Sequence, residues 1–269
     1  MIRGIYKVLT DPSARGDWRF LAFLRIGKWL MPNYRFQWPQ LAWWHDEVFN
    51  AYLKRFEEFE GVNSDRRWMI HQLTKLVHSV PGDTAECGVF QGSSSYLICR
   101  SLPDRTHYMF DSFEGLSTPS PTDGTFWSAN VLACDLETAQ KNLSGCPNAS
   151  FHKGWIPERF KDVESRRFCF VHIDVQLYDP TRDSIEFFYP RMSSGGVIVC
   201  DDYGFVNCPG ATRAVDEFLS DKPERMISLS CGSAFLIKGV PGGETSLSTS
   251  QSGRVTRYSP SREDAPGTY

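Results

Sequence analysis

The stretch Phe168-Cys169-Phe170-Val171-His172-Ile173-Asp174 is a short apolar run that ends abruptly in a carboxylate, and Val197-Ile198-Val199-Cys200-Asp201-Asp202 repeats the pattern. An unpaired charge is very costly to bury, so the aspartates are expected at the ends of two strands. Open α/β sheets bind ligands outside the carboxyl ends of their parallel strands. Asp174, Asp201 and Asp202 therefore predict a site for a hard divalent cation at this edge of a sheet.

Asp201 and Asp202 are adjacent, and successive residues of a strand point to opposite faces of a sheet. Both can reach one ion only if Asp202 already lies in the loop beyond the strand, and the Tyr203-Gly204 pair that follows favours such a loop. A lone aspartate in this position more often caps a helix or a turn. Three aspartates at the ends of two neighbouring strands favour the metal site.

The chain has 269 residues, 41% of them hydrophobic, and a net charge of −3, which is typical of a globular protein with one large α/β domain and a smaller addition. No basic run is present, which argues against a nucleic-acid binder. Eight cysteines without a CxxC pair argue against a disulfide framework and a thiolate zinc site. We expect buried free thiols, such as Cys87, Cys169 and Cys200, in a reducing compartment, the cytoplasm.

Residues 1–62 are rich in aromatic side chains and are expected to form short helices. Residues 1–10 lack the apolar core of a secretory signal, and the apolar segment 20–30 is too short and too charged to span a bilayer. The charges of this segment do not fall on one helical face. A helix that packs on the domain or on a partner subunit is therefore favoured over a membrane-surface helix, and a homo-oligomer is expected. The segment either covers the site or forms the dimer contact.

Strand and helix patterns alternate over residues 63–239, which predicts a mainly parallel sheet covered by helices. The expected strands cover 84–89, 108–111, 149–152, 168–174 and 197–201, with an antiparallel hairpin of 226–230 and 233–238 across Cys231-Gly232. Helices are expected over 63–77, 93–100, 136–143, 179–189 and 211–219. Asp179 and Pro180 are expected to begin the fourth helix. Residues 240–269, rich in Gly, Ser, Thr and Pro, are expected to form a disordered tail.

The first expected helix has an apolar stripe that should be buried, formed by Met69, Ile70, Leu73, Leu76 and Val77.

The segment Glu86-Cys87-Gly88-Val89-Phe90-Gln91-Gly92-Ser93-Ser94 follows the first strand. Its glycines allow a close approach of backbone to a ligand, and the helix that they open would direct N–H groups at it. The spacing is not GxGxxG, which weakens a dinucleotide interpretation. Asp111, at the end of the second strand and about 20 residues later, can accept hydrogen bonds from both ribose hydroxyls of a nucleoside. The two features together favour nucleoside binding over a structural turn.

Two histidines also lie near strand ends. His152 follows a further strand and is a candidate general base, because its ordinary pKa is near 6.5. A histidine in such a place more often lines a cleft or the surface. His172 lies inside its apolar run and is expected to be structural.

In this order, the residues resemble the S-adenosylmethionine-dependent, divalent-metal-dependent O-methyltransferases of the macrocin type, which methylate sugar hydroxyls in macrolide and aminocoumarin antibiotic synthesis. The resemblance covers about residues 66–218. It is carried by Val80-Pro81-Gly82-Asp83, Glu86-Cys87-Gly88-Val89 with Gly92, Asp111-Ser112-Phe113-Glu114-Gly115-Leu116, Gly154-Trp155, His172-Ile173-Asp174 with Tyr178, Ser194-Gly195-Gly196, and Asp201-Asp202-Tyr203-Gly204.

The resemblance implies a Rossmann-like class I methyltransferase fold, with S-adenosylmethionine and Mg²⁺ as cofactors. Six residues would surround the methionine part of the cofactor: Glu86, Cys87, Gly88, Gly92, Ser93 and Ser94. The resemblance places Asp111 at the ribose, with Ser112, Gly154 and Trp155 at the adenine. Asp174 would lie near the cofactor and, with Asp201 and Asp202, would bind Mg²⁺.

The sequence departs from the family at one position. The family usually has Asp-x-Asp-x-Tyr, and its second aspartate has been assigned as the base that deprotonates the acceptor. This chain has Asp174-Val175-Gln176-Leu177-Tyr178, and Gln176 cannot take a proton at neutral pH. Metal and orientation would then activate the acceptor hydroxyl. Asp174 and His152 remain the catalytic candidates, with His152 or water carrying the proton.

The leading expectation is an O-methyltransferase that uses S-adenosylmethionine and Mg²⁺ on a hydroxyl of a small molecule, a sugar of a natural product. One alternative is a catalytically weak or non-catalytic module that binds a nucleoside or a partner, which Gln176 motivates. Another alternative is a nicotinamide oxidoreductase, which the missing GxGxxG and the unused aspartate pair disfavour.

Overall fold

The computed structural model describes residues 12–31, 41–58 and 63–243. The chain divides into two compact units, residues 1–50 and 51–269, which are described separately. In the first, α2 (Pro12–Leu30), the 3₁₀ turn η1 (Ala42–His45) and the start of α3 (Glu47–Arg55) are helical, as expected. Asp46 caps α3, because its Oδ1 accepts the backbone N–H of Phe49 at 2.7 Å.

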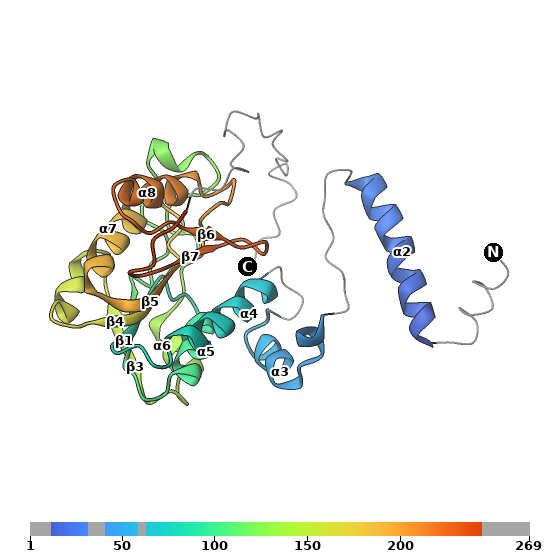
Figure 1. The fold of residues 1–269 in the computed structure, drawn as a ribbon, viewed down its shortest axis with the longest axis horizontal. Coiled ribbons are helices and arrows are strands. Elements are labelled where there is room, and N and C mark those ends of the chain that lie inside the picture. Colours follow the sequence, from blue (N-terminus) through green and yellow to red (C-terminus); the bar gives the residue numbers. More distant parts are fainter. Residues whose placement is uncertain (1–11, 32–40, 59–62, 244–269) are drawn as a thin grey trace. The chain divides into compact units, whose positions relative to one another are not determined.

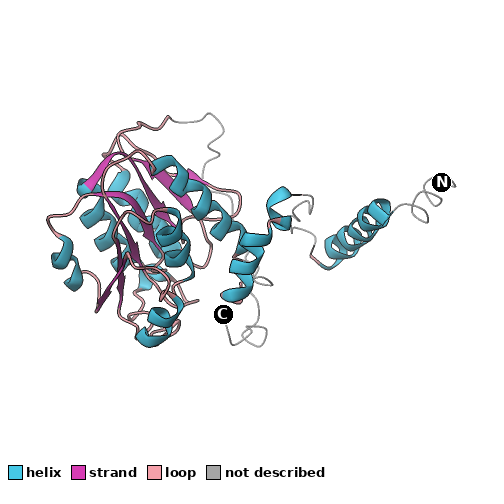
Figure 2. Cartoon of the chain, turned by 90° about the horizontal axis from the view of Figure 1, so that it is seen from below, coloured by secondary structure: helices cyan, strands magenta, loops and turns pink. Residues whose placement is uncertain are grey.

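The second unit is built on a seven-stranded sheet in the order β3-β2-β1-β4-β5-β7-β6 (Figures 1 and 2). The strands are β1 (Asp83–Cys87), β2 (His107–Asp111), β3 (Ala149–Lys153), β4 (Phe168–Ile173), β5 (Met192–Cys200), β6 (Ile227–Ser228) and β7 (Ala234–Ile237). Strands β1 to β5 are parallel, whereas β7 pairs antiparallel with β5 and with β6. The mainly parallel sheet and the C-terminal hairpin are therefore confirmed.

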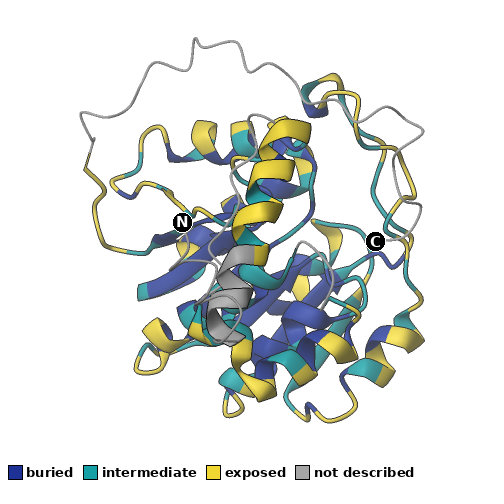
Figure 3. Ribbon diagram, turned by 90° about the vertical axis from the view of Figure 1, so that its right-hand side faces the viewer, coloured by how far each residue is buried: buried dark blue, intermediate teal, exposed yellow. Residues whose placement is uncertain are grey.

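Helices cover both faces of this sheet. One face packs on α4 (Ser64–Leu73), the 3₁₀ turn η2 (Thr74–Val77), α5 (Ser93–Ser101) and α6 (Leu136–Asn142). The other face packs on η4 (Glu158–Val163), α7 (Tyr178–Phe188) and α8 (Pro209–Leu219). Short turns η3 (Pro121–Asp123) and η5 (Tyr189–Arg191) complete the elements. Figure 3 shows the strands buried between the helices, whose outer sides are exposed.

The first predicted helix of this unit is only partly correct. It is α-helical as far as Leu73 and then tightens into η2. A 3₁₀ turn has three residues per turn, so α-helical spacing no longer fixes which side chains after Leu73 face the core. Leu76, predicted to be buried, is 51% exposed, whereas Ile70, Leu73 and Val77 are buried.

The prediction that Asp179 and Pro180 begin the fourth helix is wrong. Helix α7 begins at Tyr178, so both residues lie within its first turn, where Asp179 pairs with Arg182 at 2.7 Å. The backbone N–H of Tyr178 donates instead to Asp123 Oδ1 at 2.6 Å. A residue 55 positions earlier in the chain therefore caps the helix.

All eight cysteines carry free thiols, and six of them are buried. This confirms the expectation for Cys87, Cys169 and Cys200. In the expected tail, residues 240–243 are described and residues 244–269 lie outside the described residues. Among the described residues, no helix is long and apolar enough to cross a bilayer.

Candidate functional site

Residues 88–92, the glycine loop, leave the carboxyl end of β1 and lead into α5. Gly88 has a left-handed φ of +83°, and a Cβ at this position would lie 1.8 Å from the carbonyl oxygen of Asp174. Only glycine fits this contact. The N–H of Asp174 donates to the carbonyl of Cys87 at 2.8 Å, so the loop packs backbone to backbone against the end of β4.

Asp111 holds the glycine loop in place. Its Oδ2 accepts the backbone N–H groups of Val89 at 2.7 Å and Phe90 at 3.0 Å, and its Oδ1 accepts that of Phe113 at 2.7 Å. The N–H of Gly154 donates to the carbonyl of Asp111 at 2.9 Å, which brings the Gly154-Trp155 pair beside the end of β2. The predicted ribose and adenine residues thus gather at one corner of the sheet, next to the loop. The bond from Phe113 is the turn cap that the sequence left open as an alternative role of Asp111, whereas the bonds from the glycine loop were not predicted.

Glu86, the last but one residue of β1, is fully buried at the centre of a polar network. Its two carboxylate oxygens accept hydrogen bonds from the hydroxyls of Ser94 and Ser95 at the start of α5. His172 on β4 contacts Glu86 Oε1 through Nδ1 at 2.7 Å. The other ring nitrogen of His172, Nε2, faces Asp201 Oδ1 at 3.5 Å.

The imidazole of His172 carries a positive charge in this setting. Burial alone would lower its pKa, but the carboxylates of Asp201 and Glu86 at its two nitrogens raise the pKa to about 10. Burial alone would raise the pKa of Glu86, yet the hydrogen bonds from His107 and His172 hold it well below its usual range. His172 is therefore an imidazolium between two carboxylates.

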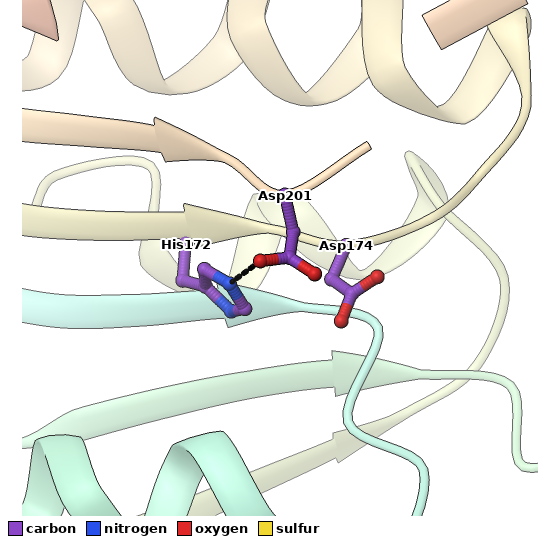
Figure 4. A group of neighbouring side chains, drawn as sticks. All are labelled: His172, Asp174 and Asp201. Atoms are coloured by element: carbon purple, nitrogen blue, oxygen red, sulfur yellow. Dashed lines mark ion pairs between the residues drawn. The ribbon is translucent and has the colours of Figure 1, made fainter. Parts of the chain in front are cut away.

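Asp174, Asp201 and Asp202, the acidic cluster, follow the ends of β4 and β5. Figure 4 shows Asp174 and Asp201 beside His172. Strand β5 ends at Cys200, so Asp202 lies in the turn beyond it, which is the arrangement that a shared ion would require. One ligand atom each from His172, Asp174 and Asp201 lie within 4.8 Å of one another. A protonated imidazole has no lone pair to offer, so the carboxylates are the groups of this set that could hold a cation.

Gln176 bridges two members of the acidic cluster. Its side-chain Nε2 donates to Asp174 Oδ1 at 2.7 Å and lies 3.5 Å from Asp202 Oδ1. Its backbone N–H donates to Asp202 Oδ2 at 2.8 Å, from a left-handed conformation with φ of +57°. Where the family carries a second aspartate, this chain thus has an amide that ties Asp174 to Asp202.

The acidic cluster holds an excess of negative charge. Burial and the charge of Asp201 raise the pKa of Asp174 to about 6, and burial with the charges of Asp174 and Asp201 raises that of Asp202 to about 8. Burial would also raise the pKa of Asp201, but Arg66 and His172 hold it well below its usual range. The described polar contacts of Asp174 and Asp202 are to groups without positive charge, Gln176 and Cys208. Hard oxygen ligands with unbalanced charge fit a divalent cation.

Sequence reasoning missed Arg66, which donates from α4 to Asp201 Oδ2 across 135 residues of sequence. It also missed the contacts of Ser93, whose Oγ donates to Glu58 at 2.6 Å and whose carbonyl accepts the hydroxyl of Tyr52 at 3.1 Å. No local pattern marks these pairs, because the two partners of each pair lie 35 to 135 residues apart in the sequence.

Two predicted site residues lie apart from the acidic cluster. His152 sits on β3, three strands from β4, which is roughly 14 Å at the usual strand spacing. Its Nδ1 lies 2.9 Å from Asp162 Oδ2, and its ring stacks on Phe110 at 5.0 Å. The side chain of Cys87 points into the core under α7. The structure therefore does not bring His152 to Asp174, and only the backbone of Cys87 faces the glycine loop.

The β2–α6 loop, residues 112–135, reaches the acidic cluster through Cys208. The indole Nε1 of Trp127 donates to Cys208 Sγ at 3.3 Å, and Cys208 Sγ lies 3.6 Å from Asp202 Oδ1. Phe126 packs edge to face on Trp127, with ring centroids 4.9 Å apart, and is 55% exposed. An aromatic surface thus lies next to the carboxylates.

Known proteins similar to this chain are O-methyltransferases. It is 31% identical over 160 residues to 8-demethyl-8-(2,3-dimethoxy-alpha-L-rhamnosyl)-tetracenomycin-C 4'-O-methyltransferase of Streptomyces olivaceus, covering 52% of this chain and 60% of the relative. It is 30% identical over 163 residues to mycinamicin III 3''-O-methyltransferase of Micromonospora griseorubida, covering 53% and 62%. The chain thus matches about 60% of the length of these relatives.

Two solved methyltransferase structures resemble this chain in fold. The O-methyltransferase NovP superposes with a TM-score of 0.54 at 28% identity, over 65% of this chain and 80% of NovP. CalS11, a calicheamicin methyltransferase, superposes with a TM-score of 0.59 at 18% identity, over 77% and 96%, which shows a shared Rossmann-like fold. The family model of the macrocin-O-methyltransferases (TylF) matches residues 65–227, which contain the glycine loop and the acidic cluster. This chain belongs to the macrocin-O-methyltransferase family.

Proposed function

We propose that this chain is an O-methyltransferase that uses S-adenosylmethionine and Mg²⁺ to methylate a hydroxyl of a small molecule, a sugar of a natural product. The observation that carries the proposal is that the Asp111-braced glycine loop and the acidic cluster share one sheet edge within the family match. The sugar acceptor rests on the names of the relatives, above all the 4'-O-methyltransferase whose substrate carries a rhamnosyl group. The family match and the relatives are methyltransferases, which disfavours a nicotinamide oxidoreductase.

In this proposal, the residues around the glycine loop hold the cofactor. Glu86 and the start of α5 with Ser93 and Ser94 lie at its methionine end, and Asp111 with Ser112, Gly154 and Trp155 lie at its nucleoside end. Three of the roughly four lone-pair sites of the Asp111 carboxylate accept backbone N–H groups, so the remaining site, on Oδ1, is available to a ribose hydroxyl.

Asp174, Asp201 and Asp202 would hold Mg²⁺. When bound, S-adenosylmethionine supplies an electrophilic methyl group, and Mg²⁺ supplies Lewis acidity that eases loss of a proton from the acceptor hydroxyl. The residues of this chain then orient the acceptor in line with the methyl group. Trp127 and Phe126 offer an apolar surface for the face of a sugar ring beside the carboxylates. Gln176 has no group that can take a proton, and His152 lies three strands away from the acidic cluster. Proton removal from the acceptor therefore falls to Asp174 or to water.

The location and assembly follow from other features. Eight free thiols support a reducing compartment, and we place the enzyme in the cytoplasm. Exposed apolar side chains of α2, including Trp29 and Leu30, support a homo-oligomer.

Calorimetric titration with S-adenosylhomocysteine tests the proposal. We expect binding by the wild-type chain, and a loss of about tenfold or more in affinity for Asp111→Ala, because the glycine loop loses two backbone hydrogen bonds to a carboxylate and the turn at Phe113 loses a third. Asp162→Ala, which removes a carboxylate beside His152 on the far strand, is the matched control and should bind normally. Binding of NAD in place of S-adenosylhomocysteine would refute the assignment.

A further inference from the structure

The ring of His172 physically joins the two halves of the proposed site. Its Nδ1 contacts Glu86 Oε1 at 2.7 Å, and its Nε2 faces Asp201 Oδ1 at 3.5 Å (Figure 4 shows the Asp201 end). Glu86 precedes the glycine loop by one residue and accepts the hydroxyls of Ser94 and Ser95 beyond it. Asp201 belongs to the acidic cluster. A single side chain therefore lies between the cofactor region and the cation region.

The sheet fixes this position. Glu86 on β1 is in register with His172 on β4, and His172 is in register with Val199 on β5, two residues before Asp201. The three side chains Glu86, His172 and Asp201 are each 0% exposed. A close-packed interior transmits small displacements, because buried groups have no free space in which to relax.

His107 provides a natural comparison within the same network. It lies on β2, on the other side of β1, and is also 0% exposed. Its Nε2 lies 3.7 Å from Glu86 Oε2 and 3.3 Å from the hydroxyl of Ser95, while its Nδ1 contacts Thr84 Oγ1 at 2.8 Å. His107 thus supports Glu86 as His172 does, but its described contacts do not include the acidic cluster.

We propose that His172 is a positioning residue that couples cofactor binding to cation binding, through the chain Glu86–His172–Asp201. The inference rests on the proposed function. When either ligand binds, it orders one end of the Glu86–His172–Asp201 series and, through the imidazole ring, the other end. The second ligand then binds to a site that is already ordered, so the coupling between the two is favourable. Because coupling is reciprocal, the cofactor should raise cation affinity by the same factor.

A purely structural role for His172 predicts a different result. Its replacement would then weaken both ligands by general loosening, but each would still respond to the other as before. The quantity that separates the two roles is the coupling factor, the ratio of the dissociation constants of S-adenosylhomocysteine without and with saturating Mg²⁺.

The experiment is a calorimetric titration of the full chain with S-adenosylhomocysteine, in EDTA and in saturating Mg²⁺. For the wild type, we expect Mg²⁺ to tighten binding about fivefold or more, the lower end of typical coupling between sites. In His172→Gln the factor should fall to about one, because the amide cannot hold both carboxylates. In His107→Gln binding should weaken while the factor stays at the wild-type value. His172→Asn is the second variant if His172→Gln does not fold.

Three outcomes would overturn the inference. The first is a wild-type factor of one, which needs no variant to measure. The second is a wild-type chain that does not bind Mg²⁺ although it binds S-adenosylhomocysteine, and this outcome would leave the cofactor assignment intact. The third is an equal loss of the factor in His107→Gln and His172→Gln. A chain that binds no S-adenosylhomocysteine at all would instead refute the proposed function itself.

Discussion

At the scale of single residues, the site differs from its family pattern mainly at Gln176. The sequence shows that an acid is missing there, but it does not show what the amide does. In the structure, the left-handed backbone of Gln176 directs both its N–H and its side-chain amide at the acidic cluster. These bonds relieve part of the repulsion between Asp174 and Asp202. The substitution therefore exchanges a titratable group for a fixed pair of donors.

The positions of the aspartates could be predicted, because a carboxylate is costly to bury inside an apolar strand and therefore belongs at the end of one. The partners of those aspartates could not. Arg66 and Ser233 bond Asp201 from elements far away in the chain, and only the fold brings them together.

The raised pKa values of the acidic cluster predict that the cation-free protein becomes less stable as pH rises. Asp174 and Asp202 have pKa values of about 6 and about 8 when folded, above the ordinary 3.8, so the folded state binds more protons between pH 4 and 8. The free energy of unfolding therefore falls across this window. His172 acts in the same direction above pH 6.5, since its folded pKa is about 10.

Thermal denaturation in EDTA at pH 5 and pH 8 measures this effect, and a lower Tm is expected at pH 8. Asp202→Asn should reduce the difference, whereas Gln176→Asp should enlarge it by adding a carboxylate beside Asp174. Mg²⁺ should raise the Tm at pH 8, because it binds the folded state. Equal Tm values at the two pH values in EDTA would contradict the charge assignment.

At the scale of elements, the strands were more predictable than the helix ends. A buried parallel strand is recognised by a continuous apolar run, as in β4 and in residues 197–200 of β5. The first half of β5, with its serines and glycines, has no such run. A helix end depends on whichever group satisfies its free N–H groups, and that group need not be local. Helix α7 illustrates this, because its cap comes from Asp123 in the β2–α6 loop rather than from the neighbouring Asp179.

Asp123 is expected to fasten the β2–α6 loop beside the site. Its Oδ1 accepts the N–H of Tyr178, and its Oδ2 accepts both the N–H and the hydroxyl of Ser120 at 2.8 Å. Asp123→Ala leaves buried donors unpaired and should lower the free energy of unfolding by about 1–3 kcal/mol. Ser120→Ala, which keeps the bond to Tyr178, should cost about 1 kcal/mol or less. Urea denaturation measures the free energy of unfolding of both variants. Equal losses in the two would show that Asp123 does not cap α7.

At the scale of the whole molecule, the first 45 residues differ in charge from the rest of the chain. They contain seven Lys and Arg residues against two Asp residues, although the whole chain has a net charge of −3. The sequence predicted a separate helical segment over residues 1–62, whereas the compact units divide after residue 50. The difference arises because Tyr52 and Glu58 contact Ser93 on α5. These are long-range hydrogen bonds, and local composition does not predict them.

Deletion of residues 1–45 should therefore leave the affinity for S-adenosylhomocysteine unchanged, since every described contact of the glycine loop lies in the second unit. Deletion of residues 1–62 removes Tyr52 and Glu58 and should weaken binding. Calorimetry on both truncated chains separates these expectations. The shorter deletion should also elute later from an anion exchanger, because it removes more cations than anions. A loss of binding in the 1–45 deletion would show that this segment contributes to the site.

The distribution of the thiols has a practical consequence. Six cysteines are buried, which leaves Cys134 and Cys231 half-exposed. Cys134 closes the β2–α6 loop, and Cys231 lies in the turn between β6 and β7. A maleimide dye should label these two positions first, and Cys231→Ser would confine the dye to the loop. The native chain thus already carries an optical reporter position in the β2–α6 loop, with which a change in that loop on ligand binding can be followed in real time.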